Sequence, residues 1–343
     1  MPFIDKVLGL KSLSIVGTAK NTGKTETLNY ILKRLASVAP ERTIGLTSIG
    51  LEGERRDQVT QTEKPEITLR TGSLFVTAES YYRQKELSAE VLGVERRYTT
   101  STGRLIYARV KGRGKVLIAG PPTTQGLRKV VDEMTNIGAD LAIIDGALSR
   151  KSLASPVVAE GLVLATGAAL SAQPDHLIQQ TKHLVAQIRL PELPNRMLAA
   201  RLEQADNGIR VVTKDGEVID PGFASALLPA LWEDSKWREG RGLLFISGSV
   251  HDTLLDRVRQ SSVFDGLIIR DFTRLFVSGR AMRSFLDSGK QLFCLNKAQL
   301  LAVTFNPQSP SGFRMHSKEM CDRLSQELGL PVYDIKKVDE SIS

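Results

Sequence analysis

The segment that most constrains the fold is a glycine-containing loop near the start of the chain. Residues Gly17–Thr25 read GTAKNTGKT, which fits the pattern G-x-x-x-x-G-K-[ST]. The apolar run Leu13–Val16 before this loop predicts a buried strand, and residues 28–35 after it carry apolar side chains at helical spacing. A strand, a loop and a helix in this order are the context in which such a loop binds phosphate. The sequence therefore predicts an α/β fold with a mostly parallel sheet.

Short apolar runs alternate with amphipathic stretches through the rest of the 343 residues, a pattern typical of α/β proteins. We expect a P-loop nucleotide-binding domain over residues 1–190 and a second α/β domain over residues 191–343, because prolines cluster directly after residue 190. Frequent Tyr, Thr and Gly near residues 67–113 predict a β-rich insertion in the first domain. The apolar run Val116–Ala119 predicts a further strand.

Composition limits the partners and the compartment. Lys and Arg number 46 and Asp and Glu 38, so the net charge of +8 is modest for this length. The sequence contains no run of basic residues interleaved with aromatic residues, so it gives no sign of a nucleic-acid partner. Two cysteines, Cys294 and Cys321, indicate a reducing compartment. The sequence has neither a signal-peptide pattern nor an apolar stretch of about 20 residues, so we expect a cytoplasmic protein without a membrane partner. The modest net charge also leads us to expect no nucleic-acid partner.

The residue types in this loop are the ones that phosphate binding requires. Gly17 and Gly23 permit backbone angles that turn successive N–H groups inward, where they can cradle phosphate oxygens. Lys24 is expected to reach the β- and γ-phosphates, and Thr25 to offer its hydroxyl to Mg²⁺. Lys20 is open to two interpretations, a contact to phosphate or to a partner subunit's nucleotide, or a solvated lysine. We expect ATP and Mg²⁺ as cofactors, with contacts from Gly17, Lys20, Asn21, Thr22, Gly23, Lys24, Thr25 and Glu26.

An acidic residue is needed beside the loop to hold magnesium. Asp145 directly follows the apolar run Leu141–Ile144, and a carboxylate at the end of a buried strand can hold Mg²⁺. The alternative for Asp145 is a turn formed with the following glycine. Asp57, in the charged stretch 51–64, is a second candidate, with Glu52 and Glu54 or a plain solvated loop as alternatives. We therefore expect catalytic roles for Lys24, Asp145 and Asp57, and metal contacts from Thr25, Asp145 and Asp57.

Several stretches together resemble one known family. They are Ser14–Thr25, Gly45–Gly50 with Glu52–Glu54 and Asp57, Gly72–Phe75 with Ala78 and Glu79, Ile144–Ala147 with Arg150 and Ser152, and Asn306–Pro307 with Ser309–Pro310. In this set the chain resembles the P-loop subunit of the lysine 5,6-aminomutase reactivase. The resemblance runs over most of the chain, although only the P-loop is a motif of high specificity.

The resemblance implies a chaperone-like function. Members of that family work with a larger, MutS-like ATPase subunit to release damaged cobalamin from an inactivated, adenosylcobalamin-dependent aminomutase. It implies that Gly23, Lys24 and Thr25 contact nucleotide and that Asp145 is the magnesium acid. A nucleotide can drive such a release if its bound states differ in affinity for the mutase.

Two other functions remain open. One is an ATP-dependent ligase of the dethiobiotin synthetase type, a family whose loop also opens with Gly-Thr, as Gly17-Thr18 does here. Such an enzyme would phosphorylate a carboxylate that an amine then attacks. The other is a regulatory or nucleic-acid-linked P-loop protein, which only the positive net charge suggests.

Overall fold

The computed structural model describes residues 2–48, 67–147, 155, 158–205, 208–222, 226 and 242–340. The chain forms two compact units, one comprising Met1–Lys182 with Gln299–Ser343 and the other comprising His183–Ala298. This division differs from the expected one, which placed residues 299–343 in the second domain. The final segment belongs to the first unit because its strand pairs with the central sheet there, from Gln299 opposite Gly161 to Asn306 opposite Gly167.

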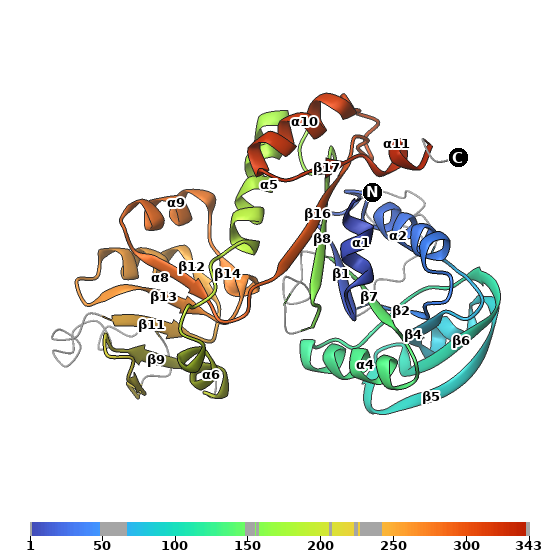
Figure 1. Ribbon diagram of the computed structural model, residues 1–343, viewed down its shortest axis with the longest axis horizontal. Coiled ribbons are helices and arrows are strands. Elements are labelled where there is room, and N and C mark those ends of the chain that lie inside the picture. The colour runs from blue at the N-terminus through green and yellow to red at the C-terminus, as the bar shows by residue number, and fades with distance from the viewer. Residues whose placement is uncertain are drawn as a thin grey trace. The chain divides into compact units, whose positions relative to one another are not determined.

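The first unit is built on a ten-stranded sheet in the order β17-β16-β8-β1-β7-β2-β4-β6-β3, with β5 also paired to β6 (Figure 1). The strands are β1 (Ser12–Gly17), β2 (Ile44–Ser48), β3 (Thr68–Leu69), β4 (Leu74–Ala78), β5 (Glu86–Thr100), β6 (Gly103–Lys115), β7 (Leu141–Ala147), β8 (Gly161–Gly167), β16 (Gln299–Asn306) and β17 (Val332–Tyr333). Pairing is parallel from β17 through β4 and antiparallel at β6. The expected α/β fold with a mostly parallel sheet is therefore confirmed.

Helices cover both faces of this sheet because successive residues of a buried strand point to opposite sides. On β7, Ile143 packs in one apolar cluster with Leu28 of α2, and Ile144 packs in another with Leu127 of α4. The helices of this unit are α1 (Pro2–Leu8), α2 (Lys24–Val38), α3 (Glu79–Arg83), α4 (Thr124–Asn136), α5 (Pro174–Ile188, whose last residues enter the second unit), α10 (Ser317–Leu328) and α11 (Ile335–Glu340).

The region near residues 67–113 is rich in β-structure, as the sequence predicts, but part of it belongs to the central sheet, because β4 pairs in parallel with β2. The expected strand at Val116–Ala119 is wrong. Val116, Ile118 and Ala119 are buried, but the segment follows the end of β6 without joining a ladder. Its backbone bonds instead to a side chain, since Thr77 Oγ1 donates to Leu117 O at 2.7 Å and accepts from Ala119 N at 3.2 Å.

The second unit holds a five-stranded sheet in the order β10-β9-β11-β13-β15, in which β11, β13 and β15 are parallel. Its elements are α6 (Arg196–Gln204), β9 (Ile209–Val212), β10 (Val218–Ile219), β11 (Gly242–Ile246), β12 (Val250–His251), α8 (Asp252–Gln260), β13 (Phe264–Ile269), η3 (Phe272–Arg274), β14 (Leu275–Phe276), α9 (Gly279–Asp287) and β15 (Gln291–Cys294). Its core packs Leu244 with α8 and α9 and Phe245 with α6, so this unit is also α/β. Among the described residues, no helix of either unit is long and apolar enough to cross a membrane.

Candidate functional site

The loop of residues 18–23 joins the carboxyl end of β1 to the amino end of α2, at the centre of the larger sheet. Every residue of β1 is buried, which fixes where the loop begins. Gly23 is the N-cap of α2 with φ 89° and ψ 17°, and no side chain caps the helix there. The backbone N–H groups of the first turn, together with the positive end of the helix dipole, are therefore directed at the space in front of the loop.

The loop is closed by its own hydrogen bonds. Thr22, only 1% exposed, turns its hydroxyl inward and donates to Ala19 O at 2.9 Å. A Cβ on Gly17 would lie 2.9 Å from that hydroxyl, so glycine is required where the loop folds over the end of β1. Thr18 N donates to Ala165 O of β8 at 2.8 Å, which ties the start of the loop to the neighbouring strand.

Lys24 and Asp145 face each other at the front of this loop. Lys24 Nζ lies 3.2 Å from Asp145 Oδ1, with side chains 17% and 10% exposed. Asp145 is placed by β7, which pairs in register with both β1 and β2, and its own carbonyl accepts a hydrogen bond of 2.8 Å from Ser48 Oγ. The sequence prediction that this acid lies beside the loop is therefore met in position.

The Asp145 carboxylate can accept a further hydrogen bond or bind a cation. Its Oδ1 is buried and has no hydrogen-bond partner within the described part of the chain, since the nearby ammonium of Lys24 does not approach with hydrogen-bond geometry. A buried carboxylate oxygen without a hydrogen bond normally has an ion or a water as its partner. The hydroxyl of Thr25, the second residue of α2, belongs to the same end of the sheet. This donor set suits Mg²⁺, which prefers oxygen ligands and keeps several waters.

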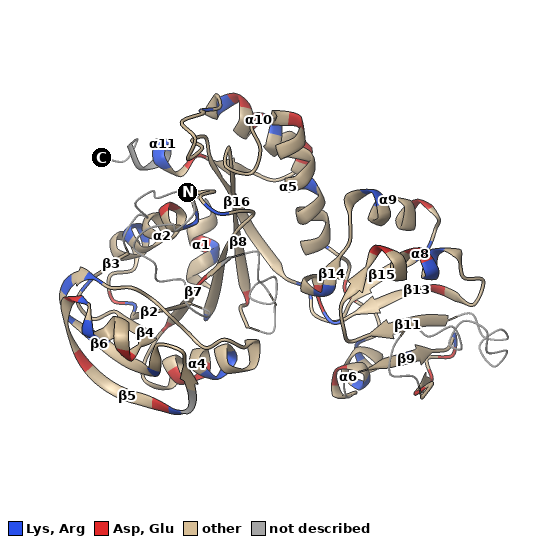
Figure 2. Ribbon diagram, turned by 180° about the vertical axis from the view of Figure 1, so that it is seen from behind, with Lys and Arg blue, Asp and Glu red and all other residues tan. Residues whose placement is uncertain are grey.

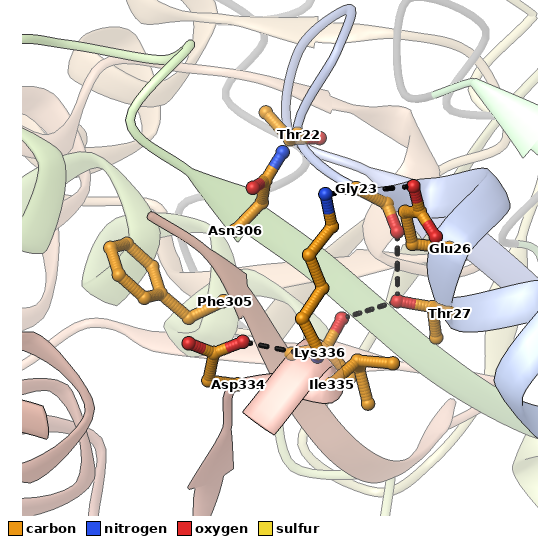
Figure 3. A pocket seen from close by; sticks show the side chains of 10 residues that line it. Thr22, Gly23, Glu26, Thr27, Phe305, Asn306, Asp334, Ile335 and Lys336 are labelled. Carbon is orange, nitrogen blue, oxygen red and sulfur yellow. Dashed lines mark hydrogen bonds and ion pairs between the residues drawn. The ribbon is translucent and has the colours of Figure 1, made fainter. Parts of the chain in front are cut away.

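A pocket adjoins the loop on the side of β16 and the C-terminal segment (Figure 3). It holds about 230 Å³ of empty space, part of it open to solvent, and is lined by Thr22, Gly23, Glu26, Thr27, Thr304, Phe305, Asn306, Asp334, Ile335 and Lys336. Glu26, a predicted cofactor contact, forms an ion pair at the rim of the pocket, with its Oε1 3.8 Å from Lys336 Nζ. Both side chains are more than a third exposed, so this pair adds little stability.

The structure gathers nine of the predicted site residues at one end of the sheet: Gly17, Lys20, Asn21, Thr22, Gly23, Lys24, Thr25, Glu26 and Asp145. Asp57, with its alternatives Glu52 and Glu54, lies outside the described residues. Lys20 is exposed at the tip of the loop. No cluster of three or more His, Cys, Asp or Glu side chains suited to a metal occurs within the described ranges.

Sequence reasoning gave no role to the residues that reach the loop from the far end of the chain. Asn306, at the end of β16, donates from Nδ2 to Asn21 O at 3.2 Å. Thr304 bonds through its hydroxyl to that of Thr27 at 2.8 Å. Asn306 belongs to the Asn306–Pro307 stretch of the family resemblance, which assigns it no role, and both residues lie at the carboxyl end of an apolar run, where ligands of parallel sheets gather.

Charges of both signs are distributed over the two units, and neither cysteine forms a disulfide. Figure 2 shows Lys and Arg interspersed with Asp and Glu over the helices and strands of both units. Burial raises the pKa of the Cys294 thiol to about 12 and that of the Cys321 thiol to about 11. Both cysteines are free, Cys294 is buried, and Cys321 is half-buried. Thiols with such raised pKa values are poor nucleophiles near neutral pH, so neither is a candidate catalytic group.

Neither a family model nor a curated protein matches the chain. Among solved structures, the chain is similar to the protein in "Structure of pNOB8 ParA bound to nonspecific DNA" with a TM-score of 0.25 and 10% sequence identity. The similarity covers 61% of this chain and 64% of that chain, so less than two thirds of the ParA chain is spanned. A likeness this distant does not bear on function, and the fold assignment rests on the strand order and pairing described above.

Proposed function

We propose that this chain is a P-loop NTPase subunit that binds ATP and Mg²⁺ at the loop of residues 17–25. The observation that carries the proposal is the placement of Lys24 and Asp145, 3.2 Å apart in front of the uncapped first turn of α2. A lysine and a helix N-terminus bind phosphate, and a buried carboxylate oxygen that accepts no hydrogen bond can bind a cation. A site that offers both at once fits the magnesium complex of a nucleoside triphosphate.

In this proposal each residue of the site has a defined role in binding the nucleotide. Lys24 moves its ammonium from Asp145 to the phosphate oxygens, where it neutralises charge. Asp145 and Thr25 then hold the cation, which when bound supplies positive charge to the same phosphates. The backbone N–H groups from Thr22 to Thr25 orient the phosphate chain at no cost in reorganisation. Asp57 is proposed as a further acid at the magnesium.

The neighbouring pocket gives the nucleoside a place. It begins at Thr22 and Gly23, which belong to the phosphate loop, and continues past the apolar side chains of Phe305 and Ile335. Most of its other lining side chains are polar or charged, among them Glu26, Asp334 and Lys336, and such groups can form hydrogen bonds with a nucleoside. We therefore propose that the nucleoside lies on this side of the loop.

Binding is tested by isothermal titration of the full chain with a non-hydrolysable ATP analogue, with and without Mg²⁺. We expect saturable binding that Mg²⁺ strengthens and that Lys24→Ala weakens. Lys129→Ala is the matched control, because this lysine lies on α4, which packs in a different apolar cluster from α2, the helix that follows the loop. The absence of binding to the wild-type chain in the presence of Mg²⁺ would overturn the proposal.

We further propose that nucleotide binding serves the reactivation of an adenosylcobalamin-dependent aminomutase in the cytoplasm. The support is the family resemblance of the loop, of Ile144–Ala147 and of Asn306–Pro307. A mutase that has lost its adenosyl group retains a damaged cobalamin in a tight pocket, and opening that pocket requires free energy. Differential affinity of the ATP and ADP states for the client supplies that free energy. The expected partners are a MutS-like ATPase subunit and a lysine 5,6-aminomutase.

A pull-down with the tagged full chain from its own host tests this finer proposal. Mg²⁺ and ATP are present, and Lys24→Ala serves as the matched bait. We expect the wild type to recover an aminomutase and a second ATPase, and the variant to recover less of both. Recovery of neither, combined with ADP release on addition of a small carboxylic acid and an amine, would favour a stand-alone ligase instead.

A further inference from the structure

The loop that we propose for phosphate is held in shape by a residue nearly 300 positions further along the chain. Asn306 ends β16, and its side-chain Nδ2 donates a hydrogen bond of 3.2 Å to the carbonyl of Asn21 at the tip of the loop. Its Oδ1 accepts from Gln308 N at 3.1 Å, and its own carbonyl accepts from Ala168 N at 2.8 Å. The amide therefore has one defined orientation, with the donor directed at the loop. Figure 3 shows it pointing towards Thr22.

Asn21 is the residue of the loop whose backbone most needs support. Its φ of 62° makes it the single non-glycine residue with a positive φ in the described ranges. Asparagine tolerates this left-handed region better than most residues, yet the conformation is uncommon and persists where neighbours hold it. The hydrogen bond from Asn306 is a contact of that kind, because it fixes the carbonyl of the same residue.

The position of that carbonyl determines where the next N–H points. Asn21 C=O and Thr22 N–H belong to one planar trans peptide, in which the two groups point in opposite directions. A carbonyl held towards Asn306 therefore directs Thr22 N–H away from β16. The side chain of Thr22 is turned inward to Ala19 O, so the backbone N–H is the donor that this residue can offer to an anion.

Packing reinforces the same arrangement. A Cβ on Gly23 would lie 2.9 Å from Asn306 Cβ, and a Cβ on Gly167 would also lie 2.9 Å from it. The side chain of Asn306 therefore packs closely against both the end of the loop and the end of β8.

We propose that Asn306 is a positioning residue for the phosphate site, which orients the Asn21–Thr22 peptide so that Thr22 N–H faces the anion. This inference rests on the proposed nucleotide function and adds to it a determinant outside the G-x-x-x-x-G-K-[ST] motif. The ligand class is a di- or triphosphate, and inorganic pyrophosphate is the simplest probe of it.

The test compares pyrophosphate binding by the wild-type full chain, Asn306→Ala and Asn306→Asp, in titration calorimetry with Mg²⁺. Asn306→Asp keeps the shape and the acceptor for Gln308 N but removes the donor to Asn21. We expect Asn306→Ala to bind about tenfold more weakly, as the loss of one well-placed hydrogen bond implies. Asn306→Asp is expected to bind more weakly still, because it adds a negative charge.

The matched control is Ser12→Ala, at the other end of β1 from the loop, which removes the hydrogen bond that Ser12 Oγ accepts from Glu160 N at 3.0 Å. We expect it to lower the melting temperature as much as Asn306→Ala does while leaving pyrophosphate affinity at the wild-type value. The amide resonance of Thr22 in a ¹⁵N–¹H spectrum provides a direct readout. It should shift on pyrophosphate addition in the wild type and in Ser12→Ala, and much less in Asn306→Ala.

The two failures are distinguishable. If the wild type binds and Asn306→Ala binds equally well with the same Thr22 shift, the positioning role is overturned while the nucleotide site stands. If Ser12→Ala weakens binding as much as Asn306→Ala, the effect is one of general stability and the positioning role is likewise overturned. If the wild type binds neither pyrophosphate nor the ATP analogue, the proposed function and this inference fall together.

Discussion

Lys24 Nζ lies 3.2 Å from Oδ1 of Asp145, and the two side chains lie on different elements at the same end of the larger sheet. Each would have another partner when a magnesium nucleotide binds, the lysine a phosphate and the carboxylate a cation. In the structure the two charges neutralise each other. The pair therefore keeps two incompletely solvated charges compensated until the ligand arrives.

Replacement of Lys24 by alanine should remove most of the affinity for ATP. A charge-assisted contact to phosphate contributes about 1.5–3 kcal/mol, which corresponds to a loss of about 10- to 100-fold. The chain should remain folded, because the change truncates one side chain at the start of α2, but the melting temperature should fall because Asp145, only 10% exposed, loses its counter-charge. Calorimetry and a thermal melt check the two expectations. Wild-type affinity in this variant would contradict the assignment of the loop.

Replacement of Asp145 by asparagine should separate the role of the cation from that of the phosphate. The variant keeps the shape of the side chain and its backbone bond to Ser48 but loses the charge that holds Mg²⁺. We expect the gain in ATP affinity on adding Mg²⁺ to shrink by about tenfold, because a charge-assisted contact is lost. Affinity for metal-free ATP should be unchanged or higher. A titration series in Mg²⁺ measures the ratio, and an undiminished ratio would refute a metal role for Asp145.

The site could be predicted from sequence as far as it is local. Gly17–Thr25 lies between a strand and a helix whose periodicity is visible in adjacent residues, and Asp145 follows directly on an apolar run. The structure places these together because the carboxyl ends of parallel strands meet at one edge of a sheet. Asn306 could not be assigned in this way. Its contact with Asn21 depends on the position of β16 beside β8. The order of strands in a sheet cannot be predicted from the hydrophobic periodicity of each segment.

The same limit explains the two differences in fold. Val116–Ala119 is mostly buried, as an apolar run predicts, but burial does not require a ladder when a side chain such as Thr77 supplies the hydrogen bonds. The sequence of residues 299–343 predicts strands and a helix, as many other stretches of the chain do, and this pattern does not indicate which unit the segment joins. The pairing of β16 with β8, together with the packing of Leu301 and Ile335 in the core of the first unit, assigns the segment to that unit rather than to the second.

The two thiols should be nearly inert to labelling at pH 8. Burial raises the pKa of Cys294 to about 12 from an ordinary 9.0, so its thiolate fraction at this pH is lower by about a thousandfold. The pKa of Cys321 is about 11, and this thiol is half-buried rather than buried. We expect Cys321 to react first and both rates to rise as the pH increases towards these values. Labelling with a disulfide reagent, with and without denaturant, tests this. Rapid reaction of Cys294 in the folded chain would contradict its burial.

Gly23→Ala should damage the loop in two ways that a second glycine can separate. Gly23 has φ 89°, and an added Cβ would lie 2.9 Å from Asn306 Cβ. Gly72 has nearly the same φ of 87°, but an added Cβ there would meet nothing within 4 Å. We expect Gly72→Ala to cost about 1–2 kcal/mol through its backbone angle alone. Gly23→Ala should cost that amount plus about 1–3 kcal/mol for the forced contact.

Function provides the sharper contrast between these two variants. Gly23→Ala displaces the N-cap of α2 and the side chain that orients the Asn21–Thr22 peptide, so pyrophosphate affinity should fall well beyond the tenfold expected for Asn306→Ala. Gly72→Ala should bind pyrophosphate as the wild type does, because it lies before β4 and away from the loop. Denaturant melts and titrations of both variants give the two differences. Equal losses of stability and affinity in the two variants would show that the contact between Gly23 and Asn306 has no role of its own.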